Sequence, residues 1–123
     1  MNDALAEIDY GDWTGRSLDD LRQLETWKHW NAFRSGTRVP GGEAMLGVQA
    51  RAVGEMLRLA GEHPAACLAL VSHGDVIKAA LLYGLGLPID AYGRFEVEPA
   101  SISTLVVGEW GSKVLRLNEV VAA

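Results

Sequence analysis

The chain has 123 residues, of which 49% are hydrophobic and 22% charged, and its formal net charge is −5. This length and composition predict one globular domain over residues 1–123, and the singly scattered lysines and arginines argue against a nucleic-acid surface. The apolar runs are too short to cross a membrane, and a lone cysteine, Cys67, excludes a disulfide framework and is typical of a reducing cytoplasm.

The first third of the sequence predicts an irregular segment followed by helix. Gly11 and Gly15 permit tight turns after residues 4–10, and Ser17 can cap a helix that begins beside it. Apolar residues then recur at three-residue steps, and the predicted buried stripe consists of Leu18, Leu21, Leu24, Trp27, Trp30 and Phe33. His29 lies between these aromatic residues and is expected to be a partly exposed spectator.

A loop rich in Gly, Ser and Pro at residues 34–42 separates this region from a long helix. The helix is predicted from apolar residues at helical spacing, which are Met45, Val48, Ala52, Met56 and Leu59. Its other face carries Arg51, Glu55, Arg58 and Glu62, which are spaced for ion pairs and are expected to be solvated. Gly61 and Pro64 end the helix.

The stretch from Cys67 to Leu85 is the most informative in the sequence. Residues 68–71 form an apolar run without alternation, which predicts a strand buried on both faces and opened by Cys67. Helical spacing begins at Val76, so His73 should lie between the carboxyl end of a strand and the N-terminus of a helix. Open α/β sheets bind ligands at such positions, and the free N–H groups of the helix favour an anion.

The last third predicts a hairpin of strands 101–107 and 113–117 about a turn at residues 110–112. With the strand at residues 68–71, this gives three strands and three or four helices, which indicates an α/β fold. The sheet is thin, because a strand as apolar as residues 68–71 needs a neighbour on each side.

Four segments carry a more specific pattern: residues 5–15 read LAEIDYGDWTG, residues 39–43 read VPGGE, residues 72–74 read SHG, and residues 101–105 read SISTL. In this order they resemble the motifs of the histidine phosphatase superfamily, the phosphoglycerate mutase-like enzymes. Three positions depart from the family pattern: Tyr10 stands for Phe, Thr14 for Glu, and Ala44 for Ser.

The resemblance implies a three-layer α/β/α fold with helices on both faces of the sheet. It also implies a phosphomonoester hydrolase or mutase that acts through a phosphohistidine on a phosphorylated small molecule, with no cofactor. His73 and Gly74 would bind the phosphoryl group, and Glu7 would be the general acid, in an apolar setting that lets it hold a proton near neutrality. Arg38 would lie at the pocket rim, although a solvated loop charge is the favoured interpretation of this residue.

One family motif is missing, since the family begins with a strand that ends in Arg-His-Gly and no Arg-His occurs here. The resemblance therefore implies that this chain corresponds to the C-terminal part of the domain and is inactive alone. The alternative is a noncatalytic protein that binds a phosphorylated ligand or a partner. Without its first-strand neighbour, the strand at residues 68–71 would have an open edge, which predicts a homo-oligomer.

Other chemistry has less support in the sequence. Ser72 is expected to hydrogen-bond backbone, because no nucleophile-elbow motif surrounds it. No metal site is predicted, because His29, His63 and His73 lack ligand spacing.

Overall fold

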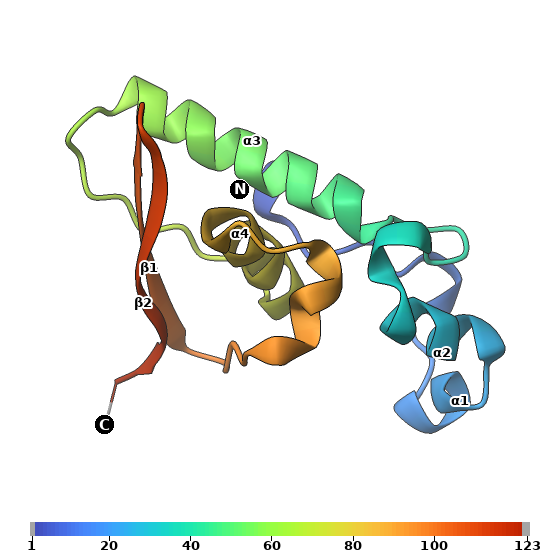
Figure 1. Ribbon diagram of the computed structural model, residues 1–123. Coiled ribbons are helices and arrows are strands. Elements are labelled where there is room, and N and C mark those ends of the chain that lie inside the picture. The colour runs from blue at the N-terminus through green and yellow to red at the C-terminus, as the bar shows by residue number, and fades with distance from the viewer. Residues whose placement is uncertain (1, 122–123) are drawn as a thin grey trace.

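The computed structural model describes residues 2–121 (Figure 1). Helices α1 (Leu18–Arg22), α2 (Glu25–Ala32), α3 (Met45–Glu62) and α4 (Gly74–Leu85) precede strands β1 (Ser101–Gly108) and β2 (Gly111–Val120). Short 3-10 helices lie at Asp3–Leu5 (η1), Gly11–Trp13 (η2), Arg34–Gly36 (η3) and Ile89–Arg94 (η4). The chain thus combines helices with a sheet, and within residues 2–121 that sheet is a two-stranded antiparallel hairpin.

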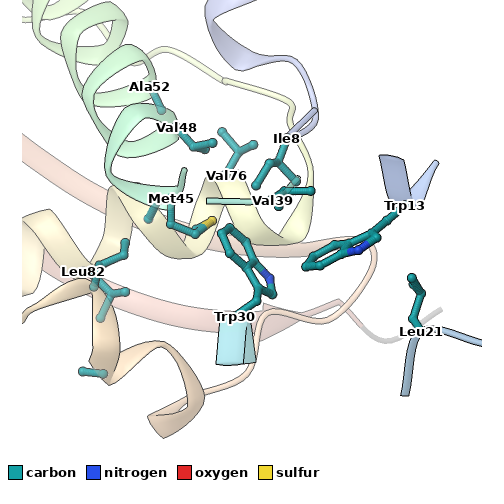
Figure 2. Close-up of a cluster of buried hydrophobic side chains, with 13 residues drawn as sticks. Ile8, Trp13, Leu21, Trp30, Val39, Met45, Val48, Ala52, Val76 and Leu82 are labelled. Atoms are coloured by element: carbon teal, nitrogen blue, oxygen red, sulfur yellow. The ribbon is translucent and has the colours of Figure 1, made fainter. Parts of the chain in front are cut away.

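The core forms where α3 and α4 pack against each other and against the N-terminal segment (Figure 2). The apolar faces of the two helices meet there, and the buried side chains on them are Met45, Val48, Ala52, Val76, Ala79 and Leu82. Ile8 and Val39 pack against this contact near Val76, at the start of α4. The Gln49 side chain also donates to the Ala79 carbonyl (2.9 Å), which fixes the two helices along their length.

A serine and a glycine set the ends of two helices. Ser17 Oγ accepts the Asp20 N–H at the start of α1 (3.2 Å), as expected of a cap. Gly86 ends α4 in the left-handed conformation at φ 71°, where a residue without a side chain is favoured.

Glycine also sets how the hairpin lies on α4. A Cβ at Gly84 would stand 2.7 Å from the Leu105 side chain, so the missing side chain lets β1 approach the helix. Ser112 Oγ of β2 donates to the Gly84 carbonyl from the other strand (3.5 Å). The hairpin predicted from sequence is confirmed, and α4 anchors it.

The predicted buried stripe of residues 18–33 is only partly buried in the structure. Trp30 is 1% exposed, and its ring centroid lies 6.1 Å from that of Trp13 in an edge-to-face contact. Phe33 and Leu18, in contrast, are 47% and 49% exposed. The prediction of core positions is therefore right for Trp30 and wrong for Phe33 and Leu18. Phe33 is exposed because α2 ends at Ala32, so the helical register does not extend to it.

The strand predicted at residues 68–71 is wrong. These residues belong to no helix or strand, Val71 is 89% exposed, and Cys67 is exposed rather than buried. Within residues 2–121, none of their backbone groups bonds another backbone group outside the regular elements. A strand needs paired neighbours on its edges, and the hairpin does not supply one. Among the described helices, none is long and apolar enough to span a membrane.

Candidate functional site

The two predicted catalytic side chains meet at the start of α4. His73 occupies the position just before the first residue of this helix, and its Nδ1 lies 3.5 Å from Oε2 of Glu7. The side chains are 52% and 43% exposed, so the pair faces solvent. The structure therefore brings Glu7 and His73 together, but the apolar setting expected for Glu7 is wrong.

Two hydrogen bonds flank this pair. Ser72 Oγ donates to the Leu5 carbonyl at 2.6 Å, and the Tyr10 hydroxyl donates to Asp75 Oδ2 at 2.8 Å. Ser72 thus bonds backbone, as the sequence predicted. Each bond joins the N-terminal segment, residues 4–12, to the turn of residues 72–75, so Glu7 and His73 lie between two points of attachment.

Asp75 is the centre of a buried polar cluster that the sequence did not reveal. Oδ1 accepts the Tyr92 hydroxyl (2.6 Å), Oδ2 accepts the Tyr10 hydroxyl, and Arg34 Nη1 lies 3.7 Å from Oδ2. The side chains of Arg34 and Asp75 are only 7% and 15% exposed. Burial and the Asp75 carboxylate raise the pKa of both tyrosines, that of Tyr92 to about 12, so both hydroxyls remain donors at neutral pH.

The Tyr92 ring also holds two cations. The Arg34 guanidinium carbon lies 3.8 Å from the ring centroid and 4.9 Å from that of Trp30, while Lys78 Nζ lies 4.1 Å from the Tyr92 centroid. Lys78 is 8% exposed and donates to the Tyr92 carbonyl at 3.1 Å. The sequence signal for this cluster was weak, because a single Arg in a Gly- and Ser-containing loop reads as a surface charge.

An aspartate in the first turn of a helix can cap the helix amides, but Asp75 does not do so. Both of its oxygens accept tyrosine hydroxyls, and no side chain of the described residues caps α4 at His73. Gly74 is exposed, with open space around it. The start of α4 is therefore exposed at Gly74 beside His73 and carries no side-chain cap, so an anion can approach it.

A second ion pair, between Arg51 of α3 and Glu43, supports the N-terminal segment. Arg51 Nε lies 3.0 Å from Glu43 Oε2, and the same guanidinium donates to the carbonyls of Ala4 (2.8 Å) and Glu7 (3.2 Å). Glu43 in turn accepts the Asp9 N–H (2.9 Å), and Arg51 holds the pKa of Glu43 below its usual value. The prediction that Arg51 belongs to a solvated face is wrong, because this pairing makes it part of the site's support.

Gly11 lets the N-terminal segment come into contact with the VPGGE segment at residues 39–43. A Cβ at Gly11 would overlap the backbone of residues 40–42, and Gly11 has a positive φ of 47°. The Asp12 N–H also donates to the Pro40 carbonyl at 2.8 Å. The loop and the N-terminal segment are thus in backbone contact, which fixes the segment that carries Glu7.

The remaining candidates lie apart from this site. Arg38 donates to the Gly42 carbonyl (2.9 Å) and lines a shallow hollow with Glu25, Thr26, His29 and Thr37. The structure does not bring it to Glu7 and His73. Over residues 2–121, no three His, Cys, Asp or Glu side chains cluster as metal ligands would.

The chain resembles known proteins in sequence over most of its length. Residues 1–120 match the family described as the Histidine phosphatase superfamily (branch 1). The chain is similar to Phosphoserine phosphatase 1 of Hydrogenobacter thermophilus, with 25% identity over 118 residues that make up 94% of this chain and 56% of that protein.

Solved structures share the fold. Bacillus stearothermophilus YhfR superposes with a TM-score of 0.86 at 25% identity, over 98% of this chain and 61% of that one. The alpha-ribazole phosphatase from Shigella flexneri gives a TM-score of 0.79 at 21% identity, over 100% and 63%. The chain therefore spans about three fifths of the length of the proteins it matches, and these are α/β folds, as predicted.

Proposed function

The chain belongs to the histidine phosphatase superfamily (branch 1), and from this premise we propose that it carries the general acid and a phosphate-binding histidine of a phosphomonoester hydrolase. The observation that supports this most directly is the approach of Glu7 to His73 at 3.5 Å, beside the exposed start of α4 at Gly74, which carries no side-chain cap. These are the two positions that match the family's motifs, and the fold brings them together from distant parts of the sequence.

The proposal gives each group a role. His73 Nδ1 faces Glu7, which leaves Nε2 to donate to a phosphoryl oxygen, while the first amides of α4 add further donors. As the bond between phosphorus and the ester oxygen breaks, Glu7 would give its proton to the leaving alcohol. The half-exposed position of the pair is suited to a substrate that enters from solvent.

The proposed substrate is a small phosphorylated molecule. The similar proteins are named phosphoserine phosphatase and alpha-ribazole phosphatase, so their names share the removal of a phosphate and differ in the organic part. This chain offers donors for the phosphate at His73 and Gly74, so the proposal extends to the phosphate ester and not to one alcohol. Arg38 stays a proposal as a rim residue for that alcohol.

We expect the chain as printed to lack histidine-dependent phosphatase activity. A phosphohistidine mechanism needs a second imidazole, and the other two histidines, His29 and His63, are exposed on α2 and after α3. Loss of a covalent nucleophile costs orders of magnitude in rate. Turnover of p-nitrophenyl phosphate should stay at background, and turnover that disappears in His73→Ala would contradict this expectation.

Binding and catalysis can be tested separately. Inorganic phosphate should displace the amide signals of Gly74 and Asp75 and the ring signals of His73 in an NMR titration. A synthetic strand peptide that ends in Arg-His-Gly, added to the same sample, should restore turnover that Glu7→Gln abolishes. If millimolar phosphate moves none of these signals, the proposed site does not bind phosphate in this chain.

A noncatalytic role has one observation in its favour, namely the exposed apolar segment at residues 67–71. Leu68, Leu70 and Val71 are 46%, 40% and 89% exposed, and over residues 2–121 their backbone groups make no backbone hydrogen bond, so they could pair with another strand. We propose that this segment associates with a second copy of the chain, because strand addition satisfies backbone groups and buries apolar side chains together. Sedimentation should show a dimer at micromolar concentration, and a monomer with slow amide exchange along residues 68–71 would rule this out.

A cytoplasmic location is also proposed. Cys67 is a free and exposed thiol. Such a thiol persists most readily where glutathione keeps thiols reduced.

A further inference from the structure

The Glu7–His73 contact is exposed, and among the described residues neither side chain makes a hydrogen bond or ion pair to any further side chain. Glu7 Oε1 accepts the N–H of the adjacent Ile8 (3.0 Å), and its Oε2 faces the His73 ring. Exposed ion pairs of this kind contribute about 0–1 kcal/mol and do not hold two chain segments together. The register between the two segments must therefore come from the flanking contacts.

The two flanking bonds differ in strength. The bond from Ser72 to the Leu5 carbonyl joins neutral groups, whereas the bond from Tyr10 to Asp75 ends on a carboxylate that is 15% exposed. Hydrogen bonds to an ionised group are roughly twice as strong as neutral ones. The attachment at Asp75 therefore dominates, and it lies two residues after His73 and joins a tyrosine three residues after Glu7.

Asp75 is itself held from three sides. Tyr92 of η4 donates to its other oxygen, and the buried Arg34 of η3 supplies a positive charge at 3.7 Å. Nε and Nη1 of Arg34 have no hydrogen-bond partner among the described residues, so its charge acts on Asp75 through space. Because three separate elements converge on it, the carboxylate cannot shift without moving the loops around the site.

From these contacts we propose that Asp75 is a positioning residue, which holds the N-terminal segment through Tyr10 so that Glu7 faces His73. The proposal rests on the proposed function in one respect, which is that Glu7 and His73 act as a pair. Asp75 is not placed to touch a substrate, because both of its oxygens accept tyrosine hydroxyls beneath the exposed pair.

A double-mutant cycle on the ring signals of His73 tests this role. Glu7→Gln should displace the ¹⁵N and ¹³C ring signals of His73 in the otherwise unchanged chain, because the facing carboxylate is lost. In an Asp75→Asn background, most of that displacement should disappear, since Glu7 no longer faces the ring. Tyr10→Phe removes a single hydroxyl, and it should give the same result if Asp75→Asn folds poorly.

Tyr83→Phe is the matched control. Tyr83 is a half-exposed tyrosine on α4, and the full displacement should persist in its background. An unchanged displacement in both the Asp75→Asn and Tyr10→Phe backgrounds would overturn the proposal, and so would a displacement that is absent from the start. The cycle uses no phosphate, so a wild-type chain that fails to bind phosphate would refute the proposed function and leave the result for Asp75 standing.

Discussion

Replacing Arg34 by methionine removes the buried positive charge behind the site while keeping most of the side-chain volume. Arg34 lies between the rings of Trp30 and Tyr92 and faces Asp75, and its Nη2 donates to Asn31 Oδ1 at 3.0 Å. The substitution therefore leaves the Asp75 carboxylate buried without its cation. We expect a large loss of folding stability from a residue that lies in a loop.

The magnitude follows from three terms. Breaking a buried ion pair by removing one partner costs about 3–5 kcal/mol, and two ring contacts contribute about 0.5–1 kcal/mol each. Tyr10 and Tyr92 still donate to Asp75, and these two hydrogen bonds offset about 1–3 kcal/mol of the roughly 4–7 kcal/mol sum. The expected net destabilisation is about 3 kcal/mol, which is a large share of the roughly 5–15 kcal/mol that stabilises a domain.

Urea unfolding followed by circular dichroism measures this change, and the melting temperature should fall by roughly 10 °C for a chain of this length. Arg22→Met is the control, because Arg22 is exposed and its removal should cost no more than about 0.5 kcal/mol. Asp75→Asn should cost less in the Arg34→Met background than alone, since the two residues are coupled. Equal stability of Arg34→Met and the wild type would show that the tyrosine hydroxyls alone satisfy Asp75.

Two other predictions concern the support of the N-terminal segment. Because Arg51 holds the pKa of Glu43 below its usual value of 4.5, the stability from this carboxylate is present above that pH and is lost as pH falls through the lower folded value. Acid titration of the unfolding free energy should therefore be shallower in Glu43→Gln, which itself costs about 1 kcal/mol at pH 7. Gly11→Ala should cost about 1–2 kcal/mol from its left-handed backbone alone, and more from overlap with residues 40–42, as thermal unfolding would show.

The sequence predicted those parts of the fold that depend on local pattern. The long helix from Met45, the helix after His73 and the hairpin are confirmed, because each has a hydrophobic period and end signals within one stretch of sequence. The buried strand at residues 68–71 was wrong because burial depends on partners elsewhere. An apolar run reports that a segment can be covered and does not report whether the chain covers it.

The site divides in the same way. Glu7 and His73 were predicted from motifs, and the structure brings them together. Arg34 was missed, because nothing in its neighbours marks a loop arginine as buried until the Tyr92 ring of η4 is seen to lie against it. Arg38 looked equivalent in sequence and lies elsewhere, beside the hollow at His29.

The site also depends little on the segment that the sequence placed at the centre of a sheet. The contacts that hold Glu7 against His73 come from the N-terminal segment, the turn at residues 72–75, the 3-10 helices that carry Arg34 and Tyr92, and the pair of Arg51 and Glu43. None comes from residues 67–71, whose backbone groups remain unpaired within the described chain. A strand that pairs with residues 67–71 could therefore join the site while Glu7 and His73 keep the positions they have in this structure.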